Sequence, residues 1–252
     1  MANPFDLAGR VAVVTGANTG LGQAIAVALA QAGADVALVG RSPMDDTAAR
    51  IAATGRESLA IRADLSRTAP IADIVRRVDD WRGRLDILVN NAGIIRRADA
   101  LEFTEADWDD VMSTNLKSVF FLAQAAARHM VEHRRGGKIV NVASVLSFQG
   151  GIRVASYTSA KSALAGLTRL LANEWASKGI NVNAIAPGYF ETNNTAALRA
   201  DRERNAAIVA RIPAGHWGKP EELGGAAVFL ASAASDYVHG ITLPVDGGWL
   251  SR

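Results

Sequence analysis

The stretch that decides the fold is residues 10–22, which read RVAVVTGANTGLG. Its first part, Arg10–Thr15, is an apolar and β-branched run typical of a buried strand. Glycines then follow at 16, 20 and 22, where they permit a tight turn and let backbone N–H groups approach a pyrophosphate at the start of a helix. This pattern predicts a dinucleotide site lined by Gly16, Asn18, Thr19, Gly20, Leu21 and Gly22.

Short strand-like runs alternate with longer helical patterns along the rest of the chain. The predicted strands are Arg10–Thr15, Asp35–Val39, Ser58–Arg62, Asp86–Val89, Lys138–Ala143, Ile180–Ile185 and Ile241–Pro244. The predicted helices are Thr19–Ala32, Asp45–Thr54, Thr68–Trp81, Glu105–Glu132, Ala155–Lys178 and Pro220–Ala233. This alternation predicts an α/β, doubly wound (Rossmann) fold with a seven-stranded parallel sheet and helices on both faces, in a single domain over residues 1–252.

Composition excludes several classes of function. The chain has 252 residues, of which 49% are apolar and 21% charged, and its 27 basic and 25 acidic residues give a net charge of +2. So small a charge argues against nucleic acid as a partner. The absence of cysteine excludes disulfides, a thiol nucleophile, a thiolate zinc site and an iron–sulfur cluster. No run reaches the ~18 apolar residues of a membrane span and no charged leader precedes an apolar core, so we expect no membrane partner and a cytoplasmic protein.

Tyr157 and Lys161 carry the first chemical signal. They are four residues apart on a predicted helix, so their side chains emerge on one face, where an ammonium can stabilise a phenolate. A tyrosine has an ordinary pKa of about 10, so a nearby cation is what general acid/base duty requires. Ser144 follows a predicted strand, where its hydroxyl can hydrogen-bond a substrate oxygen that faces the tyrosine.

Five motifs occur in one order along the chain: the Thr15–Gly22 glycine pattern, Asn90-Asn91-Ala92-Gly93, Asn115 with Ser144, Tyr157-Thr-Ser-Ala-Lys161, and Pro187-Gly188. Together they resemble the short-chain dehydrogenase/reductase family over essentially the whole chain. The resemblance implies that Tyr157 is the catalytic acid/base, Ser144 polarises the reacting oxygen, Lys161 binds the nicotinamide ribose and Asn115 holds a relay water. It further implies a cofactor site with Asp64 beside the adenine, Thr192 at the carboxamide, and Leu65, Asn91, Ala92, Gly93, Tyr157, Lys161, Pro187 and Gly188 as further contacts.

A narrower resemblance rests on Asn90–Arg97, Trp108–Met112, Ser147–Arg153, Asn173–Ala176, Ala186–Tyr189, Thr192–Thr195 and Asp246–Leu250. These stretches are similar to bacterial dehydrogenases that act on 2-deoxy-D-gluconate or 2-dehydro-3-deoxy-D-gluconate in uronate and pectin breakdown. The resemblance implies an enzyme that interconverts a secondary alcohol and a ketone on a 3-deoxy sugar acid. The alternatives are a gluconate 5-dehydrogenase, a 3-oxoacyl-carrier-protein reductase and, outside enzymes, a dinucleotide-binding sensor.

Two sets of arginines separate substrate from cofactor. Arg96 and Arg97 follow a predicted strand at the mouth of the crevice, where one of them could bind a substrate carboxylate, with Ser144, Gln149 and Tyr189 as further substrate contacts. Arg41 stands at the end of the second strand, where a strict NAD enzyme would carry an acidic residue. That position permits NADP, whereas the resemblance favours NAD, so the cofactor is either NAD or NADP.

Three further features concern the whole molecule. Residues 188–218 interrupt the alternation and predict a substrate lid, with an ordinary packed helix pair as the alternative for Thr195–Arg211. His129-Met-Val-Glu-His133 matches the H-x-x-E-H pattern of some zinc sites. The segment lies at a predicted helix end, where His and Arg interact favourably with the helix dipole, and no third ligand is evident in the sequence. We therefore predict no metal. The family resemblance implies a homotetramer built through Glu105–Glu132, Ala155–Lys178 and the last strand.

Overall fold

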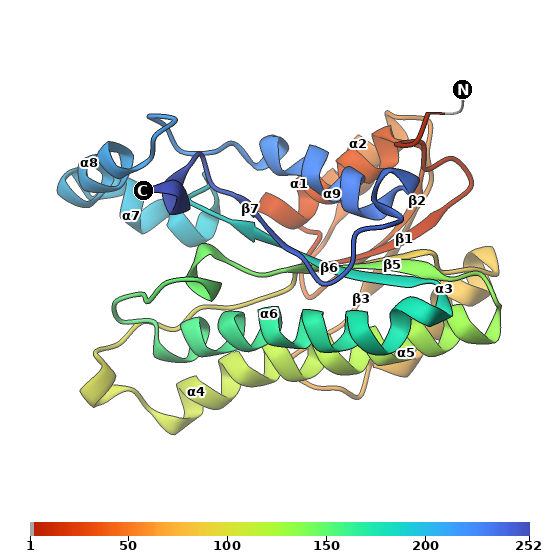
Figure 1. The fold of residues 1–252 in the computed structure, drawn as a ribbon, viewed down its shortest axis with the longest axis horizontal. Coiled ribbons are helices and arrows are strands. Elements are labelled where there is room, and N and C mark those ends of the chain that lie inside the picture. The colour runs from red at the N-terminus through yellow and green to blue at the C-terminus, as the bar shows by residue number, and fades with distance from the viewer. Residues whose placement is uncertain (1–2) are drawn as a thin grey trace.

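A computed structural model describes residues 3–252 as one seven-stranded sheet with helices on both faces (Figure 1). The strands are β1 Val11–Thr15, β2 Asp35–Gly40, β3 Ser58–Arg62, β4 Ile87–Asn90, β5 Gly137–Val142, β6 Ile180–Pro187 and β7 Thr242–Val245. All neighbouring pairs are parallel and the order is β3-β2-β1-β4-β5-β6-β7. The predicted fold class is confirmed, and each predicted strand agrees with the observed one to within two residues at either end.

The strands are apolar on both sides because both sides of the sheet are covered. In β1, Ala12 and Val14 pack into one core while Val11 and Val13 pack into the other. The first core lies under helices α1 (Gly20–Gln31), α2 (Asp45–Ala52) and α9 (Gly224–Ala231). The second lies under α3 (Ile71–Arg82), α5 (Ser118–Glu132) and α6 (Ala155–Trp175), on the opposite face in Figure 1.

The strand order reverses between β1 and β4, which lie side by side although two strands separate them in the sequence. In a doubly wound sheet the ligand crevice opens at the carboxyl ends of the strands at such a reversal. The glycine turn after β1 and the Asn90–Gly93 turn after β4 flank this point. The sequence motifs therefore converge on one edge of the sheet.

One predicted helix, Glu105–Glu132, is two helices. Helix α4 (Glu105–Met112) passes into α5 through a π-helical turn, Ser113–Lys117, which contains Asn115. A π turn inserts an extra residue into the helical repeat, so it rotates the following side chains, and such turns are frequent at functional sites. A continuous periodic pattern does not reveal it.

The segment predicted as a lid folds into helices α7 (Ala196–Ala200) and α8 (Arg202–Arg211). A single parallel bridge between Phe190 and Gly218 joins the two ends of this segment. Ile208, Ile212 and Trp217 of this segment pack with Val145 and Trp249, which lie outside it, into a small third core. Among the described residues, no helix has the length and apolar character that crossing a membrane requires.

Candidate active site

The glycine turn after β1 leaves no room for side chains. Gly16 and Gly20 have φ of +65° and +59°, a region that suits glycine. A Cβ on Gly22 would overlap the Gly16 carbonyl oxygen and the Asn91 amide. Because this first turn of α1 is bare, its backbone N–H groups are open to a ligand phosphate, and the cradle fits the pyrophosphate of a dinucleotide.

Two adjoining cavities open from this cradle. The larger, about 300 Å³, runs from Asn18 and Gly20 past Gly93 to Ser144 and Tyr157. The smaller, about 140 Å³, lies between Arg41, Asp64 and Gly93. Their walls contain most of the predicted cofactor residues: Gly16, Asn18, Thr19, Gly20, Leu21, Gly22, Arg41, Asp64, Leu65, Asn91, Ala92, Gly93, Tyr157, Lys161, Pro187 and Thr192. Predicted residues that line neither cavity are Gly188, Asn115, Arg96, Arg97, Gln149 and Tyr189.

Hydrogen bonds that the sequence did not predict join the glycine turn after β1 to the turn after β4. The Thr15 hydroxyl accepts hydrogen bonds from the backbone N–H groups of Asn91 and Ala92, at 3.0 and 2.9 Å. The Asn91 side-chain amide donates back to the Thr15 carbonyl at 2.9 Å. The threonine thus fixes the turn after β4 against the glycine turn, and the only signal in the sequence is a polar residue at the end of a buried strand.

A second unpredicted feature is a chain of buried amides under the site. The Asn90 amide donates to Asn141 at 3.0 Å, and the Asn141 amide donates to the Thr168 hydroxyl at 3.0 Å. The Thr168 hydroxyl donates to the Leu164 carbonyl at 2.8 Å. The chain links β4, β5 and α6, and so holds the helix that carries Tyr157 and Lys161 in register with the sheet.

Asn115 is fully buried in the π turn and fixes the loop after β4. Its Oδ1 accepts from the Ile94 N–H and its Nδ2 donates to the Ile94 carbonyl, both at 2.9 Å. Because these bonds engage both polar atoms of the side chain, Asn115 acts here as a positioning residue for the cavity wall. The relay water that the resemblance implies remains a prediction.

Ser144 and Tyr157 both line the larger cavity. Ser144 Oγ accepts from the Leu146 N–H at 3.1 Å, which orients the hydroxyl for donation. Burial raises the pKa of Tyr157, while the hydrogen bond with Ser144 and the positive charge of Arg97 act to lower the pKa. Since burial is the largest of these effects, the phenol is protonated at neutral pH and can donate a proton to a carbonyl oxygen.

Lys161 has a different environment from the one predicted. It is 4% exposed, and its ammonium donates to the Val142 carbonyl at 2.6 Å and lies 5.6 Å from the centre of the Tyr157 ring. Burial lowers the pKa of Lys161 to about 8. The expected lowering of the Tyr157 pKa by Lys161 is therefore not found in this structure, because the net pKa shift of Tyr157 is upward and Arg97 supplies the nearby charge.

The groups expected beside the adenosine of the cofactor line the smaller cavity. Arg41 and Ser42 face Asp64 across the smaller cavity. The Ser66 backbone N–H donates to Asp64 at 3.0 Å, and this bond, together with Arg41 and Arg67, lowers the pKa of Asp64. The carboxylate is therefore held ionised next to an exposed guanidinium.

The two candidate substrate arginines differ in their contacts. Arg96 pairs with Asp107 at 3.2 Å and with Asp110 at 3.0 Å, so its charge is used to hold α4. Arg97 donates to the Asn194 carbonyl of the lid segment at 3.2 Å and has no ion-pair partner within residues 3–252. Its positive charge also acts on the Tyr157 hydroxyl.

Tyr189 belongs to the lid segment, and Gln149 contacts it. The Tyr189 ring packs 4.5 Å from the ring of Trp249 and 5.3 Å from that of Trp217, measured between centroids. Arg211 of α8 lies 3.9 Å above the Trp249 ring and donates to Gln149 at 3.2 Å. The structure thus ties Gln149 to the lid segment rather than to the cavity wall.

The two histidines of the H-x-x-E-H pattern have a third neighbour that the sequence did not reveal. Asp79 of α3 lies 2.9 Å from His129, so a third side chain of a kind that can bind a metal lies beside the pair, although none was evident in the sequence. The residue is 50 positions away in the sequence, and only the packing of α3 against α5 brings it there.

The doubly wound sheet, the glycine cradle and the Ser144, Tyr157 and Lys161 constellation define a nicotinamide-dependent oxidoreductase, and the chain belongs to the short-chain dehydrogenase/reductase family. A family model described as "Enoyl-(Acyl carrier protein) reductase" matches residues 16–250. Among curated proteins, the chain is similar to 2-dehydro-3-deoxy-D-gluconate 5-dehydrogenases from Dickeya dadantii (58% identity, 99% of each chain) and Escherichia coli (59% identity, 98% of each chain). Among solved structures, one from Agrobacterium tumefaciens, named as a 2-deoxy-D-gluconate 3-dehydrogenase with bound NADP, has 62% identity and a TM-score of 0.94, with 100% of both chains covered.

Proposed function

We propose that this chain is a 2-dehydro-3-deoxy-D-gluconate 5-dehydrogenase, which interconverts the C5 alcohol and ketone of a 3-deoxy sugar acid. The observation that carries the substrate class is Arg97, an exposed cation without an ion-pair partner in residues 3–252 whose charge reaches the Tyr157 hydroxyl. A guanidinium whose charge acts on the acid/base suits a substrate whose carboxylate stands a few carbons from the reacting centre. The names of the two bacterial relatives agree with this class.

When bound, the nicotinamide accepts hydride from the alcohol or supplies it to the ketone. In ketone reduction, the protonated Tyr157 donates its phenolic proton to the substrate oxygen, and Ser144 donates a hydrogen bond to the same oxygen. The Leu146 N–H occupies one lone pair of Ser144 Oγ, so the hydroxyl proton is free to point at the substrate. Ser144 stabilises the negative charge that grows on the oxygen as the carbonyl is reduced.

Lys161 has two tasks in this proposal. Its ammonium, anchored on the Val142 carbonyl, can donate to ribose hydroxyls at the nicotinamide end of the cavity. It also lies near the ring that must bear negative charge when Tyr157 gives up its proton. With a pKa of about 8, the amine is mostly charged at neutral pH and keeps both roles.

We infer that NADP is the preferred cofactor, with NAD as the alternative. Arg41 lines both cavities at the adenosine end, where a guanidinium can pair with a 2′-phosphate. The Agrobacterium tumefaciens structure, with bound NADP, supports the same choice. Asp64 stands across the smaller cavity from Arg41, so the phosphate is better placed on the Arg41 side.

Gluconate 5-dehydrogenase is the nearest alternative, because its substrate is also a sugar acid and would use Arg97 in the same way. A 3-oxoacyl-carrier-protein reductase is disfavoured because a thioester substrate has no carboxylate for the arginine. A cofactor-binding sensor is disfavoured because binding alone does not require a protonated tyrosine paired with a serine hydroxyl.

We also propose that residues 188–218, the lid segment, close over the bound substrate. Asn193 and Asn194 line the larger cavity, and Arg97 reaches the Asn194 carbonyl, so closure would bring Arg97 and the lid together. The two ends of the segment meet at Phe190 and Gly218, so the expected hinge is at this base, and closure would require sliding of Ile208, Ile212 and Trp217 against Val145 and Trp249. Hydrogen exchange over α7 and α8 should slow when substrate and cofactor bind, and unchanged exchange would favour a fixed helix pair.

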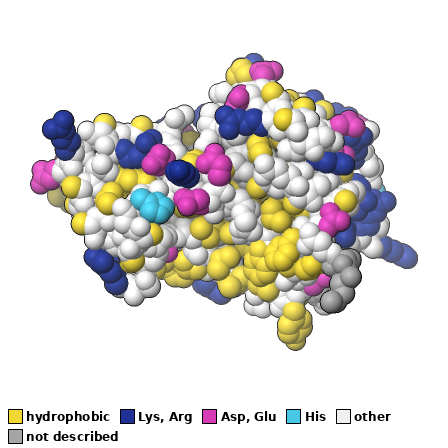
Figure 2. All heavy atoms as spheres, turned by 90° about the horizontal axis from the view of Figure 1, so that it is seen from above, with side chains coloured by type: hydrophobic (Ala, Val, Ile, Leu, Met, Phe, Trp, Pro, Cys, Tyr) yellow, Lys and Arg dark blue, Asp and Glu magenta, His cyan; other side chains and the backbone are white. Residues whose placement is uncertain are grey.

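A homotetramer is the proposed assembly. A cavity of about 450 Å³ runs between α5 and α6, and the exposed side chains of Val131 and Leu170 line it. On the face of the molecule drawn in Figure 2, hydrophobic side chains gather along the lower edge. Exposed apolar residues also flank the edge strand β7: Tyr237 is 100% exposed and Ile241 is 40% exposed. Light scattering at micromolar concentration tests this, and a monomer would contradict it.

The test of the proposed function is a panel of kcat/KM values. The purified protein is assayed with 2-dehydro-3-deoxy-D-gluconate, gluconate and an uncharged polyhydroxy alcohol, each with NADP and with NAD. We expect the first substrate with NADP to give the highest value. A preference for gluconate would support the nearest alternative, and no turnover with any sugar acid would overturn the proposal.

A further inference from the structure

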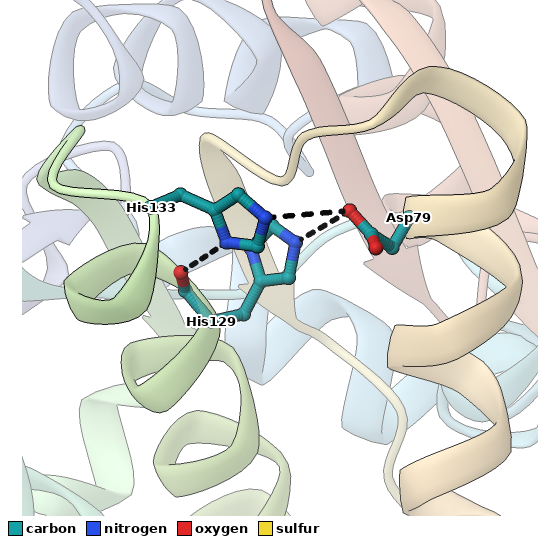
Figure 3. A group of neighbouring side chains, drawn as sticks. All are labelled: Asp79, His129 and His133. Carbon is teal, nitrogen blue, oxygen red and sulfur yellow. Dashed lines mark hydrogen bonds and ion pairs between the residues drawn. The ribbon is translucent and has the colours of Figure 1, made fainter.

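Three side chains that the reaction does not use meet at one point of the surface (Figure 3). Asp79 projects from the last turns of α3, and His129 and His133 project from the end of α5. Both helices lead into the amino ends of strands, β4 and β5, whereas the cofactor cavities open at the carboxyl ends. The cluster is therefore on the edge of the sheet opposite the active site.

Their ligand atoms converge. Asp79 Oδ1 lies 2.9 Å from His129 Nε2 and 3.9 Å from His133 Nε2, and the three atoms lie within 4.8 Å of one another. In a tetrahedral site with bonds of about 2.0–2.1 Å, ligand atoms stand roughly 3.3 Å apart. The observed distances fall on both sides of this value, so small side-chain rotations would complete the geometry.

His133 Nε2 presents an acceptor lone pair that receives no hydrogen bond from the side chains of the described residues. Its Nδ1 donates to the His129 carbonyl at 2.9 Å, so in the neutral ring the proton is on Nδ1 and the Nε2 lone pair faces the Asp79 carboxylate. The 3.9 Å separation is too long for a hydrogen bond in the charged form as well. A cation between the two acceptors would replace their repulsion by coordination, and the Nδ1 bond is the outer contact that commonly orients a metal-binding histidine.

The surroundings suit a bound cation. The Asp79 carboxylate accepts a hydrogen bond from His129 Nε2 at 2.9 Å and so presents an oxygen beside both imidazoles. His129 is 7% exposed and its Nδ1 has no partner among the described residues, so when a metal takes Nε2 the ring proton moves from Nε2 to Nδ1. The carboxyl ends of α3 and α5 add the negative end of two helix dipoles, against one opposing charge from Arg135.

We propose that Asp79, His129 and His133 bind one zinc ion or a similar divalent transition metal. Two imidazoles and one carboxylate are a donor set that zinc accepts and that calcium and magnesium, which prefer oxygen, do not. The fourth position opens to water because Asp79 and His133 are partly exposed. The ion links α3 to α5, and its role is structural because the active site is on the opposite edge of the sheet.

The experiment is zinc titration calorimetry on untagged protein freed of metal with a chelator. We expect one ion per chain in the wild type and at least a tenfold loss of affinity in His133→Gln and in Asp79→Asn. These residues are partly exposed, so both variants should fold, whereas His129 is buried and is left unchanged. Glu132→Gln, which alters the acidic member of the H-x-x-E-H pattern, and His216→Gln, which alters a histidine outside the cluster, should bind zinc as the wild type does.

Two further readouts separate a site from adventitious binding. Zinc should raise the wild-type Tm and leave the Tm of His133→Gln unchanged, and cobalt should give tetrahedral ligand-field bands only in proteins with the intact cluster. Dehydrogenase turnover should be unaffected by the chelator. Wild-type protein that binds no zinc, equal affinity in His133→Gln, or turnover lost on chelation would each overturn the proposal.

Discussion

Truncation of Arg97 is the perturbation that most sharply tests how the substrate is recognised. Arg97→Ala removes a guanidinium near Tyr157 that has no ion-pair partner within residues 3–252. A charge-assisted hydrogen bond contributes roughly 1.5–3 kcal/mol. Because Arg97 is exposed, solvent screening favours the lower part of this range, about 1.5–2 kcal/mol, which corresponds to roughly a 10- to 30-fold loss in kcat/KM.

The assay compares kcat/KM for an acidic sugar and for an uncharged ketone. We expect the loss on the acidic sugar only, and incomplete recovery in Arg97→Lys, because lysine lacks the planar fork. Arg96→Ala is the matched control: its guanidinium is held by Asp107 and Asp110, so its removal should lower stability slightly and preserve the preference for acids. Equal losses on both substrates, or the same selective loss in Arg96→Ala, would refute the assignment of the carboxylate to Arg97.

Three other substitutions test the rest of the site. Tyr157→Phe keeps the ring and removes the proton, so turnover should fall by at least ~10² while cofactor binding measured by fluorescence persists; near wild-type turnover would remove the tyrosine from its role. Lys161 has a pKa lowered to about 8, so between that pH and about 10.4 the unfolded chain binds more protons and the stability of the wild type rises with pH. The free energy of unfolding of wild type relative to Lys161→Met should therefore be flat below pH 8 and rise by on the order of 3 kcal/mol towards pH 10.4, and a flat difference throughout would contradict the burial argument. Arg41→Asp should shift the kcat/KM ratio towards NAD without changing the order of substrates, and an unchanged ratio would exclude Arg41 from cofactor choice.

Much of the fold was predictable because short apolar strands alternate with helices whose ends are marked in the sequence. The inner strands are largely buried on both faces and so are short apolar runs, and each helix begins and ends near polar or glycine residues. The break in Glu105–Glu132 was not predictable, because a π turn leaves the apolar pattern intact on either side. It follows from the packing of Asn115 against Ile94, which is a long-range contact.

Site residues that belong to short sequence motifs were predicted, whereas residues whose role depends on a partner distant in the sequence were not. The glycine turn, Ser144, Tyr157 and Lys161 belong to short motifs, and the structure gathers them around one groove. Thr15 and the Asn90, Asn141 and Thr168 chain were missed because a buried polar residue has no sequence signature until its partner on another element is known. The choice between Arg96 and Arg97 likewise depended on Asp107 and Asp110, which only the fold brings near.

The measurement that tests the central claim most directly follows the hydride itself. The protein is supplied with the 2,5-diketo form of the 3-deoxy sugar acid and NADPH deuterated at C4 of the nicotinamide, and the product is analysed by carbon NMR. We expect a single deuterium on C5 of 2-dehydro-3-deoxy-D-gluconate in the wild type and almost none in Tyr157→Phe over the same time. Deuterium on another carbon, or unlabelled diketo acid recovered intact with the wild type, would contradict this expectation.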